Sequence, residues 1–255
     1  MKHTKIIALA GKGGVGKTTL SAAIVRVLSE QYPDARILAI DADPAVGLSM
    51  ALGVEPGITL DDLRAEVIDQ AAKGANREAV EMLGEIRYRI FDAITETEHF
   101  SFMAIGRPET AGCYCAVNAY LKNVIEMVSS AFDFVVIDGE AGIEQINRRV
   151  MEKVTHLLLI SDASKKGMGV VRSIREVADE LVMYDRSGLI MNRVEDKELL
   201  DYVDTEGMEV LAVIPSDADH VKNDIRGNSI FALASDSAVL QGAREALSKM
   251  ELLEN

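Results

Sequence analysis

Residues 11–19 read GKGGVGKTT and lie between an apolar run at residues 6–10 and a helical pattern. The apolar run predicts a buried strand, and apolar side chains then recur at helical spacing at Leu20, Ile24, Val27 and Leu28. A glycine-rich turn between a strand and a helix N-terminus lets successive backbone N–H groups surround a phosphate. The segment is therefore predicted to be a phosphate-binding loop.

Two side chains of this loop have predictable roles toward a nucleotide. Lys17 is placed to neutralise the β- and γ-phosphates, and the Thr18 hydroxyl is placed to ligate a Mg²⁺ ion that bridges them. The residues expected to contact the nucleotide here are Gly11, Lys12, Gly13, Gly14, Val15, Gly16, Lys17, Thr18 and Thr19.

The chain has 255 residues, of which 48% are hydrophobic, and a formal net charge of −14. This length and composition are ordinary for one α/β domain, so we expect residues 1–255 to form a single P-loop domain. The negative charge, without a local basic patch, argues against a nucleic-acid or membrane partner. The apolar runs have the length of strands, and neither a transmembrane helix nor a signal peptide is recognisable, so the expected location is cytoplasmic.

Buried-strand patterns alternate with helical patterns along the chain. Strands are predicted at residues 36–41, 100–106, 134–138, 156–161, 188–192 and 210–214, and helices at 18–31, 116–128 and 168–181. This alternation predicts an α/β fold with a mostly parallel central sheet flanked by helices on both faces, and with ligands at the carboxyl ends of the strands. Residues 55–98, with eleven acidic and five basic residues, are predicted to form an acidic helical insertion. Its exposed side is either a solvated face or a docking surface for a partner.

Aspartates follow two of the predicted strands. Asp41 and Asp43 lie at the end of the second strand, and Asp138 ends the run FVVID, which is the setting of a Walker B motif. Carboxylates there can hold the water molecules bound to Mg²⁺, so Asp41 and Asp138 are predicted to support the ion in this way. For Asp43 a structural role, capping the following turn, is the alternative to a catalytic one.

Lys12 is a second lysine, placed early in the loop, and it marks the deviant form of this motif. In this feature the chain resembles the family that holds the nitrogenase iron protein and the division-site and plasmid-partition ATPases. The resemblance implies a homodimer that hydrolyses ATP to ADP, in which Lys12 reaches the partner's nucleotide, Lys17 binds phosphate and Asp43 polarises the attacking water. The alternative for Lys12 is a solvated loop lysine.

The same resemblance implies that adenine is recognised late in the chain. Asn192 ends a predicted strand, and its amide offers both a donor and an acceptor to a base edge. Pro215 and Asp217 follow the last strand, and their loop is expected to contribute mainly backbone atoms and packing. A simple turn residue is the alternative for Asn192.

Cys113 and Cys115 are the two cysteines of the chain and form a CxC pair before a predicted helix. A helix N-terminus favours the thiolate form, which binds soft metals. Zn²⁺ and iron–sulfur clusters are usually held by about four protein ligands, so two thiolates supply only half of such a site. The two-fold axis of a homodimer beside this loop would bring four thiolates together. Small buried cysteines are the alternative.

Residues 106–115 (GRPETAGCYC) and 138–144 (DGEAGIE) sharpen the resemblance. Together they resemble the nickel-insertion ATPases of the CooC/AcsF type, which mature carbon monoxide dehydrogenase and acetyl-CoA synthase. The resemblance implies Ni²⁺, or Zn²⁺ in its place, at Cys113 and Cys115 of two chains, and apo carbon monoxide dehydrogenase or acetyl-CoA synthase as partner. Two other functions stay open: an ATP-dependent iron–sulfur reductase of the nitrogenase iron protein type, and a nucleotide-switched positioning or partition protein.

Overall fold

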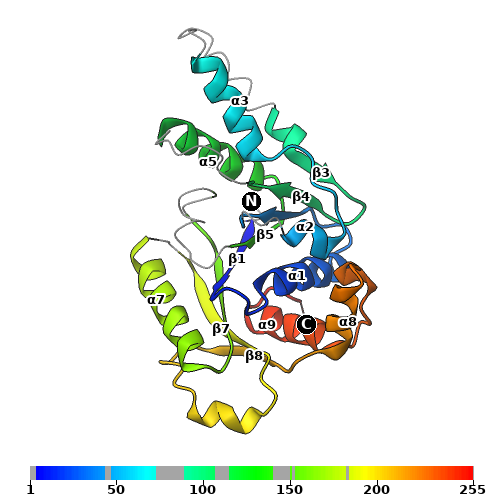
Figure 1. Cartoon of the computed structure of the whole chain (residues 1–255), viewed down its shortest axis with the longest axis vertical. Coiled ribbons are helices and arrows are strands. Elements are labelled where there is room, and N and C mark those ends of the chain that lie inside the picture. The colour runs from blue at the N-terminus through cyan, green and yellow to red at the C-terminus, as the bar shows by residue number, and fades with distance from the viewer. Residues whose placement is uncertain are drawn as a thin grey trace.

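A computed structural model gives the fold of the chain (Figure 1). It describes residues 4–43, 47–72, 89–106, 115–139, 150, 153–181 and 184–254. Within these residues the elements are β1 (Lys5–Gly11), α1 (Lys17–Gln31), β2 (Ile37–Asp41), α2 (Gly47–Leu52), α3 (Leu60–Ala72), the 3₁₀-helix η1 (Ile90–Ala93), β3 (Ile94–Glu96), β4 (Ser101–Ala104), α5 (Cys115–Ser129), β5 (Phe134–Asp138), β6 (His156–Ser161), α7 (Lys165–Leu181), β7 (Arg186–Asn192), η2 (Lys197–Tyr202), β8 (Val210–Ile214), α8 (Ala218–Ile225), η3 (Ile230–Ala232) and α9 (Ala238–Lys249).

The strands form one 8-stranded sheet in the order β3-β4-β2-β5-β1-β6-β7-β8. The central strand β1 runs parallel to both neighbours, with Ala8 opposite Ile137 of β5 and Leu157 of β6. β3 at the edge runs antiparallel, with Thr95 opposite Phe102 of β4. The prediction of a mostly parallel sheet is therefore confirmed.

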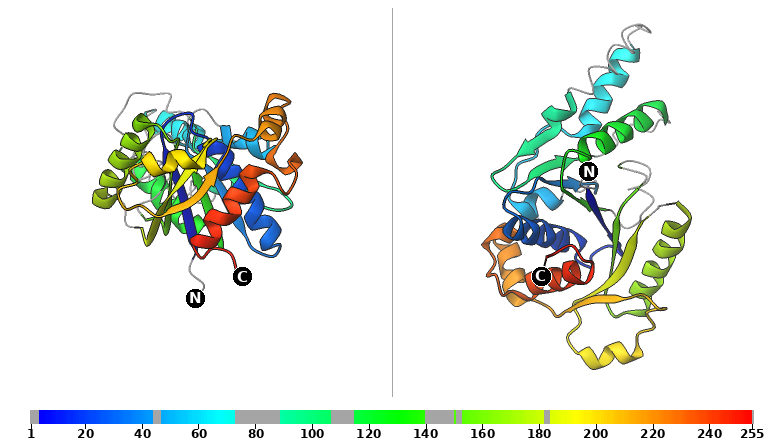
Figure 2. Two further views of the ribbon diagram at one scale, coloured as in Figure 1. Left: turned by 90° about the horizontal axis from the view of Figure 1, so that it is seen from below. Right: turned by 180° about the vertical axis from the view of Figure 1, so that it is seen from behind.

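Helices cover both faces of this sheet, as predicted. On one face α1 and α9 bury side chains such as Ile24 and Leu247 in a shared core. On the other face α5 and α7 bury Ile125 and Val171. Figure 1 shows α7 on one side of the strands and α1 with α9 on the other, and the view from behind in Figure 2 shows the same two layers. Each fully buried aliphatic side chain of this kind stabilises the fold by about 1.5–3 kcal/mol.

The predicted acidic insertion at residues 55–98 is only partly helical in the described residues. It begins with α3 as expected, but it ends with η1 and the short strand β3, which extends the sheet. The prediction of a helical segment is wrong there, because residues 94–96 form a strand. The sequence did not indicate this strand, since it is short and partly exposed and has no continuous apolar run. Residues 73–88 lie outside the described residues, as do residues 107–114.

Candidate nucleotide site

The loop between β1 and α1 has a shape that glycine alone can adopt. Gly16 has a φ of 95°, in the left-handed region, and a Cβ there would lie 2.6 Å from the side-chain nitrogen of Asn192. Backbone conformation and packing both require glycine at this position. The Asn192 Nδ2 donates a hydrogen bond of 2.7 Å to the Val15 carbonyl, so the end of β7 holds the loop in place.

A cavity of about 400 Å³ lies against this loop. It brings together groups that the sequence assigned to a phosphate site, including Lys17, Thr18 and Asp43. The Lys17 side chain is largely buried, with 7% of the residue exposed, and its Nζ donates to the Lys12 carbonyl at 3.4 Å. A buried ammonium beside backbone N–H groups is suited to bind the β- and γ-phosphates.

Asp138, at the end of β5, is fully buried behind this cavity. The Ser21 hydroxyl donates a hydrogen bond of 3.0 Å to Oδ1, whereas Oδ2 has no hydrogen-bond partner among the described residues. Burial raises the pKa of Asp138 to about 6, although hydrogen bonds from Thr18 and Ser21 and the charge of Lys17 act to lower it. An unpaired buried oxygen is costly, so Oδ2 is available to a cation or to a water bound to one.

Asp41, at the end of β2, is fully buried as well, but its oxygens are occupied. Oδ2 accepts from the Leu48 N–H at 2.8 Å, and Oδ1 accepts from the Asp43 N–H at 3.1 Å. Burial raises its pKa to about 7, against the effect of these two hydrogen bonds. In this structure Asp41 shapes the loop that carries Asp43, and the prediction that it also supports Mg²⁺ stays a prediction.

The oxygen groups of this site fit Mg²⁺. Thr18 and Asp43 line the same cavity, and Thr18 also hydrogen bonds to Asp138. Hydroxyl and carboxylate oxygens are the ligands that Mg²⁺ takes directly or through water. Thr18 and Asp138 are the residues that would hold the ion.

Lys12 points within its own chain toward the end of β6. Its Nζ lies 3.2 Å from Oδ2 of Asp162, and the two side chains are 30% and 34% exposed. Although partial burial acts to raise the pKa of Asp162, hydrogen bonds from Ser164 and Lys12 hold it below its ordinary value. The predicted contact between Lys12 and a partner's nucleotide stays a prediction, and in the single chain the lysine pairs with this carboxylate.

A second cavity of about 140 Å³ adjoins the first and contains the residues predicted to contact adenine. Asn192, Pro215 and Asp217 all line it. The Asp217 carboxylate caps α8, because Oδ1 accepts from the Asp219 and His220 N–H groups at 3.0 and 2.9 Å. Asp217 therefore shapes the cavity wall, and the Asn192 side-chain oxygen remains as an acceptor for a base amino group.

Arg193 and His220 are among the residues of these cavities that the sequence did not predict. Arg193 lines both cavities, and His220 lines the second, where its Nε2 lies 3.3 Å from the Thr19 hydroxyl oxygen. The position of Arg193 directly after Asn192 at a strand end was an available signal. Nothing in the local sequence indicates that His220 meets Thr19, which is 201 positions away.

The predicted metal site at Cys113 and Cys115 lies largely outside the described residues. Cys113 is not among them, and of Cys115 only the backbone is described, at the start of α5. In the described ranges no group of three or more His, Cys, Asp and Glu side chains could hold a metal ion. Among the described helices, none has the length and apolar character needed to cross a membrane.

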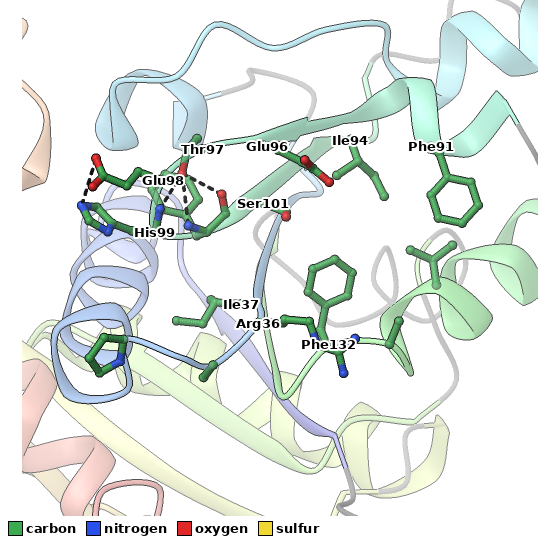
Figure 3. A pocket seen from close by; sticks show the side chains of 15 residues that line it. Arg36, Ile37, Phe91, Ile94, Glu96, Thr97, Glu98, His99, Ser101 and Phe132 are labelled. Atoms are coloured by element: carbon green, nitrogen blue, oxygen red, sulfur yellow. Dashed lines mark hydrogen bonds and ion pairs between the residues drawn. The ribbon is translucent and has the colours of Figure 1, made fainter.

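A separate cavity of about 370 Å³ lies at the opposite end of the strands (Figure 3). Its lining includes Arg36 directly before β2, Ile37 at the start of β2, Ser101 at the start of β4, and Phe132. None of its lining residues was a predicted site residue. The nucleotide site is at the carboxyl ends of the strands, so this cavity has no part in it.

Comparison with known proteins identifies the family. Residues 6–230 match the family model of the CobQ/CobB/MinD/ParA nucleotide binding domain. An uncharacterized ATP-binding protein of Methanocaldococcus jannaschii is 34% identical over 249 residues, which are 96% of this chain and 98% of that protein. The carbon monoxide dehydrogenase accessory protein CooC of Rhodospirillum rubrum is 28% identical over 219 residues, which are 76% of this chain and 81% of CooC.

The fold is also that of solved structures. The septum site-determining protein MinD of Pyrococcus horikoshii, complexed with Mg-ADP, gives a TM-score of 0.66 at 22% identity, over 97% of this chain and 96% of that one. The family match over most of the chain agrees with the phosphate-binding loop, the buried carboxylate behind it and the strand order. The chain belongs to the CobQ/CobB/MinD/ParA family of P-loop nucleotide-binding proteins.

Proposed function

We propose that the protein is a Mg²⁺-dependent ATPase that delivers nickel to apo carbon monoxide dehydrogenase or acetyl-CoA synthase. The observation that carries the ATPase part is the cavity in which Lys17, Thr18 and Asp43 meet beside the phosphate-binding loop. Asp138, whose buried Oδ2 has no hydrogen-bond partner in the described part of the chain, completes the set of groups that a nucleotide and Mg²⁺ require.

Each residue of the site has a separate role in ATP binding or hydrolysis in this proposal. Lys17 and the loop N–H groups bind the phosphates, and Asn192 binds adenine. Asp43 orients and polarises the attacking water, because it is the carboxylate that lines the phosphate cavity. Mg²⁺, when bound through Thr18 and Asp138, would neutralise the charge that develops on the β- and γ-phosphates.

Two chains are needed for the complete site in this proposal. Lys12 of one chain leaves Asp162 and contacts the nucleotide of the other. The same homodimer brings two copies of Cys113 and Cys115 together, which supplies four thiolates for one Ni²⁺ or Zn²⁺ ion. The nickel ion is cargo here, and the acceptor enzyme is its destination.

The nickel role rests on the likeness to CooC, a carbon monoxide dehydrogenase accessory protein. The likeness to MinD proteins supports a second candidate, a nucleotide-switched positioning protein. The charge of −14 disfavours that candidate, because anionic membranes and nucleic acids repel an acidic protein. The third candidate, an iron–sulfur reductase, predicts iron and acid-labile sulfide in the purified protein, which a nickel or zinc site lacks.

Anaerobic purification followed by elemental analysis tests these candidates. We expect one nickel or zinc ion per dimer, lost in both Cys113→Ser and Cys115→Ser, while each variant still binds ATP. An iron–sulfur absorption that requires the same cysteines would replace the proposal by the reductase. A metal-free protein that binds anionic vesicles or DNA in the presence of ATP would replace it by the positioning protein.

A further inference from the structure

Arg193 lies where the phosphate cavity and the base cavity meet. Among the described residues, only Gly16 and Arg193 line both cavities, and Gly16 has no side chain. A nucleotide with its β-phosphate on the loop and its base in the second cavity would have its α-phosphate and ribose at this junction. Arg193 is therefore the side chain positioned beside that part of the ligand.

The backbone at Arg193 has an unusual conformation that directs the side chain there. Its φ is 59°, in the left-handed region that few residues other than glycine adopt. The preceding residue, Asn192, is hydrogen bonded to the phosphate-binding loop. The following residue, Val194, is buried in the core, and its N–H donates to the Ile214 carbonyl at 3.0 Å. Such an outlier in a ligand cavity is a reason to look for a function.

The charge of Arg193 is not neutralised within the described part of the chain. Its Nη1 donates a hydrogen bond of 2.9 Å to the Gly14 carbonyl, which is an uncharged acceptor, and no described carboxylate forms an ion pair with it. Lys12, by contrast, is paired with Asp162. A guanidinium has five N–H donors, so the bond to Gly14 leaves others for a phosphate, which it can bind through two parallel bonds.

We propose that Arg193 binds the α-phosphate of the nucleotide that spans the two cavities. This inference rests on the proposed ATP-binding function and adds a residue to it. The hydrogen bond to Gly14 holds the guanidinium near its bound position before the ligand arrives, which reduces the entropy lost on binding. Because the contact is to phosphate, it strengthens binding of any nucleotide and does not select the base.

The test is calorimetric titration of Mg-ADP into the wild-type protein and into Arg193→Ala at 50 and 500 mM salt. At low salt we expect Arg193→Ala to bind about 10- to 100-fold more weakly, the range for a lost charge-assisted hydrogen bond. At high salt the difference should fall to a few-fold, because salt screens a partly exposed ionic contact. A difference that stays the same at both salt concentrations would assign Arg193 to stacking on the base and overturn the phosphate contact.

Two further variants separate this role from effects on folding. Arg193→Gly suits a φ of 59°, so it should melt no lower than the wild type without ligand and yet lose the same ADP affinity. Arg175→Ala is the matched control, because it removes another arginine whose Nη1 donates to a backbone carbonyl, that of Glu206 at 3.3 Å. Wild-type protein that binds ADP no better than Arg193→Ala refutes this inference alone, whereas wild-type protein that binds no Mg-ADP refutes the proposed function as well.

Discussion

The Nζ atom of Lys12 lies 3.2 Å from Oδ2 of Asp162 in the same chain. A lysine that pairs with a carboxylate of its own subunit must give up that contact before it can serve a neighbouring subunit. Partly exposed ion pairs are worth about 0.2–1 kcal/mol, so the contact weakens dimer formation without preventing it. The ion pair with Asp162 therefore competes with the predicted contact between Lys12 and the partner's nucleotide.

Replacing Asp162 by asparagine should release Lys12. The side-chain oxygen of the asparagine would still accept the hydrogen bonds of Ser164, but the neutral amide would bind the lysine less strongly. We expect dimerisation in the presence of ATP to strengthen by about two- to thirty-fold, because a symmetric dimer gives up two such pairs, together worth about 0.4–2 kcal/mol. Analytical ultracentrifugation over a protein concentration series measures this change.

Asp196→Asn is the control for that experiment, because Asp196 caps η2 by accepting from the Glu198 N–H and is exposed. It should dimerise like the wild type. Equal dimerisation of Asp162→Asn and the wild type would show that the Lys12–Asp162 pair has no influence on assembly.

Mixing two inactive variants tests the trans role of Lys12. Lys12→Gln retains its own Asp43, and Asp43→Ala retains its own Lys12. In a mixed dimer the Asp43→Ala subunit lends its lysine to the intact carboxylate of the other subunit, so one site per dimer is complete. We expect ATP hydrolysis by the mixture to exceed that of either variant alone, up to about a quarter of the wild-type rate if subunits pair at random. A mixture that remains as inactive as its parts, at concentrations where dimers form, would place Lys12 outside the partner's site.

The buried carboxylate of Asp138 should cost stability in the absence of ligand. Its folded-state pKa is about 6, against 3.8 for an unperturbed aspartate, so the folded chain binds the proton more tightly than the unfolded chain. The free energy of unfolding therefore falls as the pH rises through the window between these values, and stays lower above it. Asp138→Asn removes this effect and should stabilise the protein by about 3 kcal/mol at pH 8, with a smaller gain at pH 5.

Urea denaturation of both proteins at pH 8 and pH 5, without nucleotide or Mg²⁺, measures the gain. His156, whose pKa burial lowers to about 4, titrates in both proteins and cancels in the comparison. Asp236→Asn, at an exposed position, should leave stability unchanged. A variant that is less stable than the wild type at pH 8 would show that Asp138 is satisfied without a ligand. Asp138→Asn should also weaken the Mg²⁺ dependence of ATP binding, which links the stability cost to function.

Much of the fold was predictable because its strands are buried on both faces. The observed bounds of β5, β6 and β8 agree with the predicted strands, since continuous apolar runs mark such strands. β3 was not predictable in the same way. It is a short, partly exposed edge strand, and its pairing with β4 depends on contacts between segments rather than on its own sequence.

The candidate site, like the fold, could be predicted from the sequence only in part. Lys17, Thr18, Asp43, Asn192 and Asp217 could be found because parallel strands place their carboxyl ends, and the loops that follow, at one edge. The cap formed by Asp217, the occupied oxygens of Asp41 and the pairing of Lys12 with Asp162 required coordinates. Lys12 and Asp162 are 150 positions apart along the chain. The contacts of Asp217 and Asp41, by contrast, join residues two to seven positions apart and depend on the backbone path of their loops.

ATP hydrolysis by the purified wild-type protein, measured with and without Mg²⁺ beside Lys17→Ala and Asp43→Ala, tests the central claim most directly. We expect the wild type to release phosphate in a Mg²⁺-dependent reaction, and we expect Lys17→Ala to lose ATP binding. Asp43→Ala should still bind ATP, but its rate of hydrolysis should fall by about 100-fold or more, as is usual for loss of a catalytic group. Wild-type protein that releases no phosphate above buffer, or the same loss of ATP affinity in both variants, would contradict this claim.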